Sequence, residues 1–322
     1  MEEKGQYTSK VFIGYSSDDN IRYTATSGGV GSSILKYLFN SGKINSAISF
    51  TFDSSLLQYI PSIIYKYDDY KITGSIYHEI DLYKFLSDNI DIIRSPFCCF
   101  ALPCQVKPIK YLLSKNRIEN IIIGLTCSSQ QSIEATFLLL KLKKIKKENV
   151  EYIQYRNNGW PSGLTIILKN GQQKFVSNNN SIWTKIFHSR LFIQKKCFKC
   201  NNTLNQFADI SLADPWLKNY LAEEKIGQTL FSTNNLKSED ICQSAKTNKY
   251  IFYLELTDDE LNISQRGTIA RKLSYKKNRK IVKHLQKLFH SNIYKKIVTL
   301  NTLLFDCHCK IKNIIERILL KL

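Results

Sequence analysis

The chain has 322 residues, of which 43% are hydrophobic, and it carries a formal net charge of +19. That length and apolar content can bury one large core or two ordinary ones. The sequence contains no run of about 18 apolar residues, which excludes a membrane-spanning helix, and we expect no secretory signal. In a chain for which we expect no export signal, nine cysteines indicate ligation or catalysis rather than a disulfide framework.

The first predicted elements are a strand over residues 10–15, a glycine-rich loop and a helix. Apolar residues at helical spacing follow Ser27-Gly28-Gly29, and Gly42 is a fair helix stop. Residues 47–52 then alternate like a strand. A glycine-rich helix entry can bind a pyrophosphate through free amides and the positive helix end, but it is also a common tight turn.

The next stretch alternates predicted strands and helices. Residues 92–100 and 120–125 are predicted strands, and residues 105–113 and 129–141 are predicted helices. Strand, helix, strand and helix at this spacing favour parallel strand pairing.

Residues 150–178 are predicted to form an antiparallel element beside this α/β body. Its strands cover 150–155, 164–168 and 173–176, and Asn170-Gly171 predicts a type I′ hairpin turn. The predicted fold class is therefore α/β: a mixed sheet with parallel core strands flanked by helices, an antiparallel hairpin element, and a basic helical C-terminal segment.

The basic character is concentrated in residues 266–322, which carry 15 Lys or Arg against two acidic residues. We expect residues 1–265 to form the main domain and this segment to form helices. Three roles for this segment remain open: ordinary packing on the body, binding to an anionic membrane surface, and binding to an acidic partner such as ferredoxin. Binding to nucleic acid ranks below them. The apolar faces are predicted at Ile281, Leu285 and Leu288, and at Ile311, Ile314, Ile315, Ile318 and Leu319.

Four cysteines from three places in residues 92–216 are candidate metal ligands. Cys104 and Cys127 each follow a predicted strand, and Cys197 and Cys200 form a C-x-x-C pair. If the two strands are parallel neighbours, Cys104 and Cys127 lie at the same carboxyl edge, where open α/β sheets bind ligands. Four thiols suit a tetrahedral metal or an iron–sulfur site. The alternative is that cysteines fill the core, which we expect of Cys98, Cys99 and Cys242.

Five short motifs stand out along the chain: Thr26-Ser27-Gly28-Gly29, Leu102-Pro103-Cys104-Gln105, Gly124-Leu125-Thr126-Cys127, Tyr155-Arg156 with Gly159-Trp160, and Cys197-Phe198-Lys199-Cys200 with Ala208 to Trp216. In this order they resemble the coenzyme F(420) hydrogenase/dehydrogenase beta-subunit family over about residues 20 to 235. Two positions depart from the family pattern, because Ala101-Leu102 and Ala213 stand where the family has Gly-Thr and Gly.

The resemblance implies FAD and one 4Fe-4S cluster, since no cysteine precedes Cys98. The implied cluster ligands are the four candidate cysteines, and the Ser27-Gly28-Gly29 loop would lie by the flavin. Asp214 and Trp216 are candidates to shape the cofactor pocket, although Trp216 is equally suited to the core. Arg156 is a candidate to face a phosphate or an anionic substrate. The alternative is that it is a solvated arginine of the hairpin.

The predicted function is a flavin- and 4Fe-4S-dependent oxidoreductase. It would pass electrons between a reduced donor, such as ferredoxin, a deazaflavin or a nicotinamide, and an unidentified substrate. Similar short family members occur among genes for surface-polysaccharide synthesis, which suggests a sugar- or lipid-linked substrate. One alternative is a binding module that a zinc ion on four cysteines stabilises, with a nucleic-acid- or membrane-binding tail. Another is a metal-free glycan transferase with buried cysteines.

Overall fold

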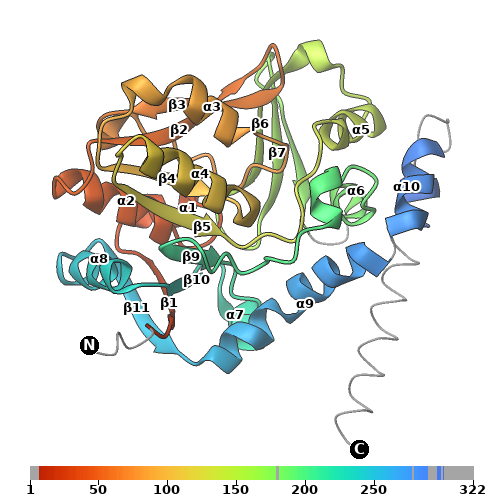
Figure 1. Cartoon of the computed structure of the whole chain (residues 1–322). Coiled ribbons are helices and arrows are strands. Elements are labelled where there is room, and N and C mark those ends of the chain that lie inside the picture. The colour runs from red at the N-terminus through yellow and green to blue at the C-terminus, as the bar shows by residue number, and fades with distance from the viewer. Residues whose placement is uncertain (1–6, 179–180, 278, 289–295, 299, 301–322) are drawn as a thin grey trace, which may run out of the picture.

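The computed structural model describes the whole chain except residues 1–6, 179–180, 278, 289–295, 299 and 301–322 (Figure 1). Its main element is an eight-stranded mixed sheet flanked by helices, which confirms the predicted α/β class. The strand order is β11 (Ile251–Leu256), β1 (Lys10–Ser16), β10 (Thr229–Thr233), β9 (Ile210–Ala213), β5 (Asn120–Leu125), β4 (Phe97–Ala101), β2 (Ser46–Asp53) and β3 (Gln58–Ile64).

The centre of this sheet is parallel. β2 pairs with β4, β4 with β5, and β5 with β9, all in parallel. The predicted parallel pairing of the two strands that precede Cys104 and Cys127 is thus confirmed. The strand predicted from residue 92 begins only at Phe97, because Ile90–Ile92 forms a 3-10 turn. β3, β9, β10 and β11 were not predicted from the sequence.

The predicted antiparallel element is a separate three-stranded sheet of β6 (Val150–Asn157), β7 (Gly163–Leu168) and β8 (Gln173–Ser177). The predicted type I′ turn is wrong. Gly171 has a positive φ of 80° and Asn170 does not. The Leu168 N–H donates to the Gln172 carbonyl over 2.9 Å, so the loop is longer than a two-residue turn and needs only one left-handed residue.

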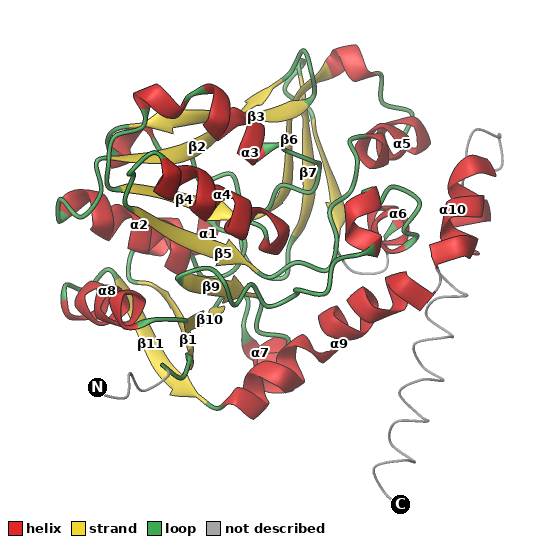
Figure 2. Ribbon diagram, viewed as in Figure 1, coloured by secondary structure: helices red, strands yellow, loops and turns green. Residues whose placement is uncertain are grey.

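Helices cover both faces of the large sheet (Figure 2). α2 (Val30–Asn40) and α8 (Leu236–Thr247) pack on one face in a cluster with Leu212 and Phe231. α3 (Leu82–Asp88) and α4 (Pro103–Lys115) pack on the other face. α5 (Glu134–Leu142) and α6 (Ile182–His188) pack against the small sheet, and the remaining short helices are α1 (Asp19–Thr24) and α7 (Lys218–Glu223).

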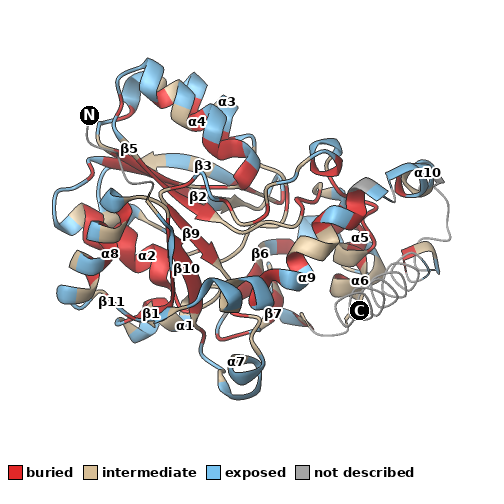
Figure 3. Ribbon diagram, turned by 60° about the horizontal axis from the view of Figure 1, so that its bottom comes forward, coloured by how far each residue is buried: buried red, intermediate tan, exposed pale blue. Residues whose placement is uncertain are grey.

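The last helices described are α9 (Asp258–Lys277) and α10 (Arg279–Leu288). α9 begins before the predicted boundary at 265/266 and runs from β11 towards α6, with several buried positions (Figure 3). In α10 the predicted apolar face is wrong at Ile281, which is 60% exposed, because Val282 is the residue that packs inward. The second predicted face, from Ile311 to Leu319, lies outside the described residues.

None of the helices in the described ranges has the length and apolarity that crossing a membrane requires.

Candidate functional site

Three candidate residues follow neighbouring strands at the carboxyl edge of the parallel centre. Cys104 comes three residues after β4, Cys127 two residues after β5, and Asp214 directly after β9. The pairing registers place these strand ends side by side. Cys104 lies in the first turn of α4, as expected. Cys127 does not precede a helix directly, because α5 begins only at Glu134 and an irregular segment lies between.

Cys197 lies on a 3-10 turn, Lys195–Phe198, that packs against the segment after Cys127, and Cys200 follows two residues beyond the turn. The Gln194 N–H donates to the Gln130 carbonyl over 3.1 Å, and the Cys127 N–H donates to the Thr203 carbonyl over 3.0 Å. These bonds tie the loops before and after the C-x-x-C pair to the end of β5.

Cys127 lies close enough to the other three candidate thiols to feel their charges. Its pKa is raised to about 12, mainly by burial; the Lys272 ammonium opposes the rise, and Cys197, Cys104 and Cys200 add to it, because negative charges would repel. Burial also raises the pKa of Cys197. The structure therefore brings together the four cysteines that the sequence set apart, and burial favours the neutral thiol form of Cys127 and Cys197.

Two polar neighbours of these sulfurs are Gln130 and Asn202. The Gln130 N–H donates to Cys197 Sγ over 3.4 Å. The Cys200 thiol donates to the Asn202 carbonyl over 3.4 Å, and the side-chain nitrogen of Asn202 is buried without a hydrogen-bond partner among the described residues. A buried donor without an acceptor costs about 1–3 kcal/mol. An anionic sulfur-rich group between the thiols would supply that acceptor, so the donor set fits an iron–sulfur cluster.

Within the described ranges, no group of three or more His, Cys, Asp or Glu side chains meets the geometry for holding one metal ion. Four sulfurs around one zinc ion must each lie about 2.3 Å from it. A cube of four irons is larger than one ion, so its ligands stand further apart.

Lys272 of α9 also belongs to this site. Its side chain is buried, with 3% exposure, and its ammonium donates to the Cys127 carbonyl over 3.4 Å. Burial lowers the pKa of Lys272, but Cys127, Cys200 and Cys197 outweigh that effect and the net pKa is raised. Its partners in the described structure are thus sulfurs and a carbonyl rather than a carboxylate. A fixed positive charge lies beside three of the four thiols.

The sequence analysis missed Lys272 because it counted this lysine with a basic tail. A usable signal is the polar periodicity of α9, whose buried positions recur at helical spacing and are mostly polar. They include Ser264, Gln265, Thr268, Lys272 and Tyr275. A helix that turns polar groups inward has polar partners to satisfy.

The other cysteines lie apart from this group. Cys98, Cys99 and Cys242 are at most 1% exposed and belong to the hydrophobic core, as predicted. Cys307 and Cys309 lie outside the described residues.

Arg156 and Asp214 form a buried ion pair. Two Arg156 nitrogens donate to the two Asp214 oxygens over 2.7 and 2.9 Å, and the Trp160 indole donates to the same carboxylate over 3.1 Å. Burial raises the pKa of Asp214, but Arg156 outweighs it and the net pKa is lowered. The alternative of a solvated hairpin arginine is wrong, since Arg156 is 5% exposed. Trp216 is half-buried and its ring lies 5.4 Å from that of Trp160.

Asp214→Asn is expected to destabilise the protein by about 3–5 kcal/mol, because it leaves the Arg156 guanidinium buried without a counter-charge. Urea unfolding measures this. Asp88→Asn breaks the exposed Lys84–Asp88 pair and should cost at most about 0.5 kcal/mol. Equal losses of stability for Asp214→Asn and Asp88→Asn would contradict the assignment of Arg156 and Asp214 as a buried ion pair.

The Ser27-Gly28-Gly29 loop is packed by the protein's own backbone. Gly28 and Gly29 both have a φ of 74°, and a Cβ on Gly28 would lie 2.7 Å from the Gln228 Cα. The Thr229 hydroxyl donates to the Ser27 carbonyl, and Asp214 accepts a hydrogen bond from the Ser27 side chain. The loop, the ion pair and the start of β10 therefore form one connected structure.

Gly28→Ala should destabilise the protein by about 2–4 kcal/mol, from left-handed strain plus the clash with the backbone of Gln228. Gly42→Ala provides a matched control, since Gly42 also has positive φ, at 64°, but open space around it. The control should lose only about 1 kcal/mol. Chemical denaturation of both variants measures the contribution of close packing around Gly28. Similar losses of stability in the two variants would show that this packing contributes little.

α9 connects the two groups of candidate residues. The Gln265 side chain donates to the Asp214 carbonyl over 2.7 Å, and Lys272, two turns further along, reaches Cys127. Seven residues of helix span about 10 Å. The ion pair beside the glycine-rich loop therefore lies roughly that far along α9 from the thiols.

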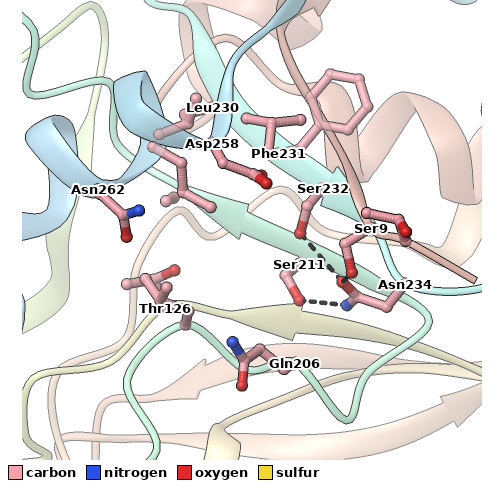
Figure 4. A pocket seen from close by; sticks show the side chains of 15 residues that line it. Ser9, Thr126, Gln206, Ser211, Leu230, Phe231, Ser232, Asn234, Asp258 and Asn262 are labelled. Carbon is pink, nitrogen blue, oxygen red and sulfur yellow. Dashed lines mark hydrogen bonds between the residues drawn. The ribbon is translucent and has the colours of Figure 1, made fainter.

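A cavity of about 280 Å³, lined by both polar and apolar side chains, lies against β9 and β10 (Figure 4). Thr126, next to Cys127, lines it, together with Asp258 and Asn262 of α9. On its wall the Asn234 amide donates to the Ser211 hydroxyl over 2.9 Å. Hydroxyl and amide groups dominate the labelled lining.

The chain is thus an α/β protein with a mixed sheet and four cysteines grouped near the carboxyl edge of its parallel centre. Residues 11–87 match the N-terminal part of the coenzyme F420 hydrogenase/dehydrogenase beta-subunit family, and residues 96–259 match the C-terminal part of the same family. The chain therefore belongs to this family, which consists of iron–sulfur oxidoreductases that transfer electrons. The predicted family and the predicted oxidoreductase class are confirmed.

Among solved structures, the chain is similar to one from the F420-reducing [NiFe] hydrogenase complex of Methanosarcina barkeri. The TM-score is 0.63 and the identity is 15%, over 87% of this chain and 96% of that chain. At this identity the likeness shows the fold alone. No curated protein gives a match.

Proposed function

We propose that this protein is a flavin- and 4Fe-4S-dependent oxidoreductase that passes electrons between a reduced donor and a substrate. One observation supports this most strongly: four thiols from three places in the chain influence one another at one sheet edge, beside a buried lysine. Buried charges need partners, and sulfur ligands of an anionic cluster would provide one for Lys272.

In this proposal Cys104, Cys127, Cys197 and Cys200 hold the cluster. The Gln130 N–H would stabilise sulfur charge, and α9 would keep water from the buried side. When bound, a 4Fe-4S cluster supplies one-electron transfer and a flavin supplies conversion between one- and two-electron steps.

We place the FAD beside the Ser27-Gly28-Gly29 loop, with Trp216 at its edge. Gly29 is the N-cap of α2, an 11-residue helix whose positive end suits phosphate. Arg156 and Asp214 support this loop through Ser27 and Thr26 and would act by holding it in shape. The separation of about 10 Å along α9 is short enough to couple flavin and cluster.

The substrate proposal rests on the cavity against β9 and β10. Its serine, threonine, asparagine and glutamine side chains and the carboxylate of Asp258 would bind hydroxyl groups, and its apolar side chains, such as Leu230 and Phe231, would contact the carbon faces of a sugar-linked ligand. This favours a sugar-linked intermediate of surface-polysaccharide synthesis. Ferredoxin, a deazaflavin and a nicotinamide are the proposed donors.

For the chain as a whole, we propose an oxidoreductase body of residues 1–265 and a basic helical segment of residues 266–322. Because Lys272 lies in the second part, that segment contributes to the site as well as to the surface. We propose a cytoplasmic location, in which the basic segment can bind an anionic membrane surface.

The test is purification without oxygen, followed by assays of iron, sulfide, zinc and flavin. The proposal expects about four irons and four sulfides per chain, with FAD in the same material. Zinc at one per chain without iron would identify a zinc-stabilised binding module instead. Protein with neither metal nor flavin would overturn the proposal.

A further inference from the structure

The segments that carry or cover the thiols contain no acidic residue. Residues 102–118, 126–133, 194–208 and 264–288 include 16 Lys or Arg and no Asp or Glu. This excess of positive charge is not confined to the C-terminal segment. It also occurs in the earlier segments that carry the thiols. A chance distribution would place carboxylates there, since the chain has 27 of them.

Part of this charge forms an exposed rim around the thiols. Lys195, Lys196 and Lys199 are exposed and flank the C-x-x-C pair, and Lys196 is close enough to Cys197 to lower its pKa. Lys107 is also exposed, one helical turn beyond Cys104, which is itself exposed. We call these four lysines the lysine rim.

The rim joins two separate elements of the fold. The Lys107 ammonium lies 3.7 Å from the centre of the Phe207 ring, and Phe207 belongs to the loop that follows Cys200. Phe207 is 47% exposed. Cationic side chains around an exposed aromatic ring and an exposed thiol suit a partner with a complementary acidic face.

We infer that the lysine rim docks an acidic protein that carries a one-electron redox centre. This rests on the proposed function and names its donor class. In the encounter the carrier is oxidised by one electron and this protein is reduced by one, with no bond formed and no proton moved. Opposite charge speeds such encounters, and weak redox pairs need only a small interface.

A membrane is the less suitable occupant of this surface. Membrane-surface binding needs apolar side chains that insert below the headgroups, whereas the Phe207 ring is covered on one face by Lys107. A small coenzyme is less suitable too, because the rim lysines are exposed and spread along two elements rather than gathered in a cavity.

The test compares two triple charge reversals in the full-length protein. One is Lys195→Glu, Lys196→Glu and Lys199→Glu. The matched control is Lys143→Glu, Lys144→Glu and Lys146→Glu, which changes the same charge on exposed lysines in the loop between α5 and β6, far from α9 in Figure 1. Thermal melts check that both variants fold.

The probe is plant-type 2Fe-2S ferredoxin, titrated at low and at moderate salt. We expect the wild type and the control to bind alike, and the rim variant to bind about tenfold more weakly or worse, with a shallower salt dependence. Equal binding by all three proteins would overturn the inference. So would rim-dependent binding to phosphatidylserine vesicles with no binding to ferredoxin, which would identify a membrane surface.

These outcomes are separable from the proposed function. Binding is measured whether or not cofactors are present, so protein without iron or flavin that still binds ferredoxin through the rim overturns the cofactor assignment alone. Protein with both cofactors whose rim variant binds normally overturns the docking inference alone.

Discussion

Cys127→Ala is expected to abolish cluster assembly. Cys127 is the candidate ligand whose pKa responds to all three other thiols and to Lys272, so its removal leaves the set incomplete at the centre. Iron and sulfide in oxygen-free preparations should fall from about four per chain to well under one. Metal analysis and electron paramagnetic resonance of the reduced protein measure the loss.

Cys242→Ala is the matched control, because Cys242 is also a free and buried cysteine, yet it belongs to the hydrophobic core. It should keep full iron content while losing about 1 kcal/mol of stability through the small cavity. Loss of iron in both variants would mean that general destabilisation, not ligation, is measured. Full iron in Cys127→Ala would refute the proposed ligand set.

The parallel centre of the fold could be predicted from the sequence because its strands are short apolar runs followed by loops and helices. Asn120–Leu125 is predicted to the residue. That pattern also placed Cys104 and Cys127 at one edge, since parallel neighbours end on the same side. Local periodicity and topology rules were sufficient for this part of the site.

The ion pair and the role of α9 could not be predicted in the same way. Arg156 meets Asp214 across 58 positions of the chain, and no local pattern records that contact. α9 has almost no amphipathic pattern of the usual kind, because its buried side is largely polar and Ile263 and Leu273 are exposed. A rule that expects apolar residues inside therefore assigns such a helix to the surface.

The inverted pattern of α9 has a physical meaning. A helix gains little by burying serine, glutamine and lysine unless polar partners await them. Here the Asp214 carbonyl and the Cys127 carbonyl supply two of those partners, over 2.7 and 3.4 Å. The helix is thus positioned by polar groups at the edge of the sheet rather than by an apolar core. Its polar inward face suits a helix that covers the thiol site.

Lys272→Met is expected to lower the midpoint reduction potential of the cluster. Reduction adds a negative charge, and a buried ammonium nearby stabilises that charge. At an effective dielectric constant of about 20, a unit charge at such close range contributes on the order of 2 kcal/mol. For a one-electron couple that corresponds to a shift on the order of 90 mV towards more negative potential. Spectroelectrochemical titration measures it.

Lys277→Met is the control, since Lys277 lies on the same helix and is exposed to solvent. Solvent screens its charge, so its shift should be under about 20 mV. Lys272→Arg keeps the charge and should hold the potential near that of the wild type, which separates charge from packing. An unchanged potential in Lys272→Met, with the cluster intact, would show that the ammonium acts on the fold alone and that α9 does not tune the electron-transfer centre.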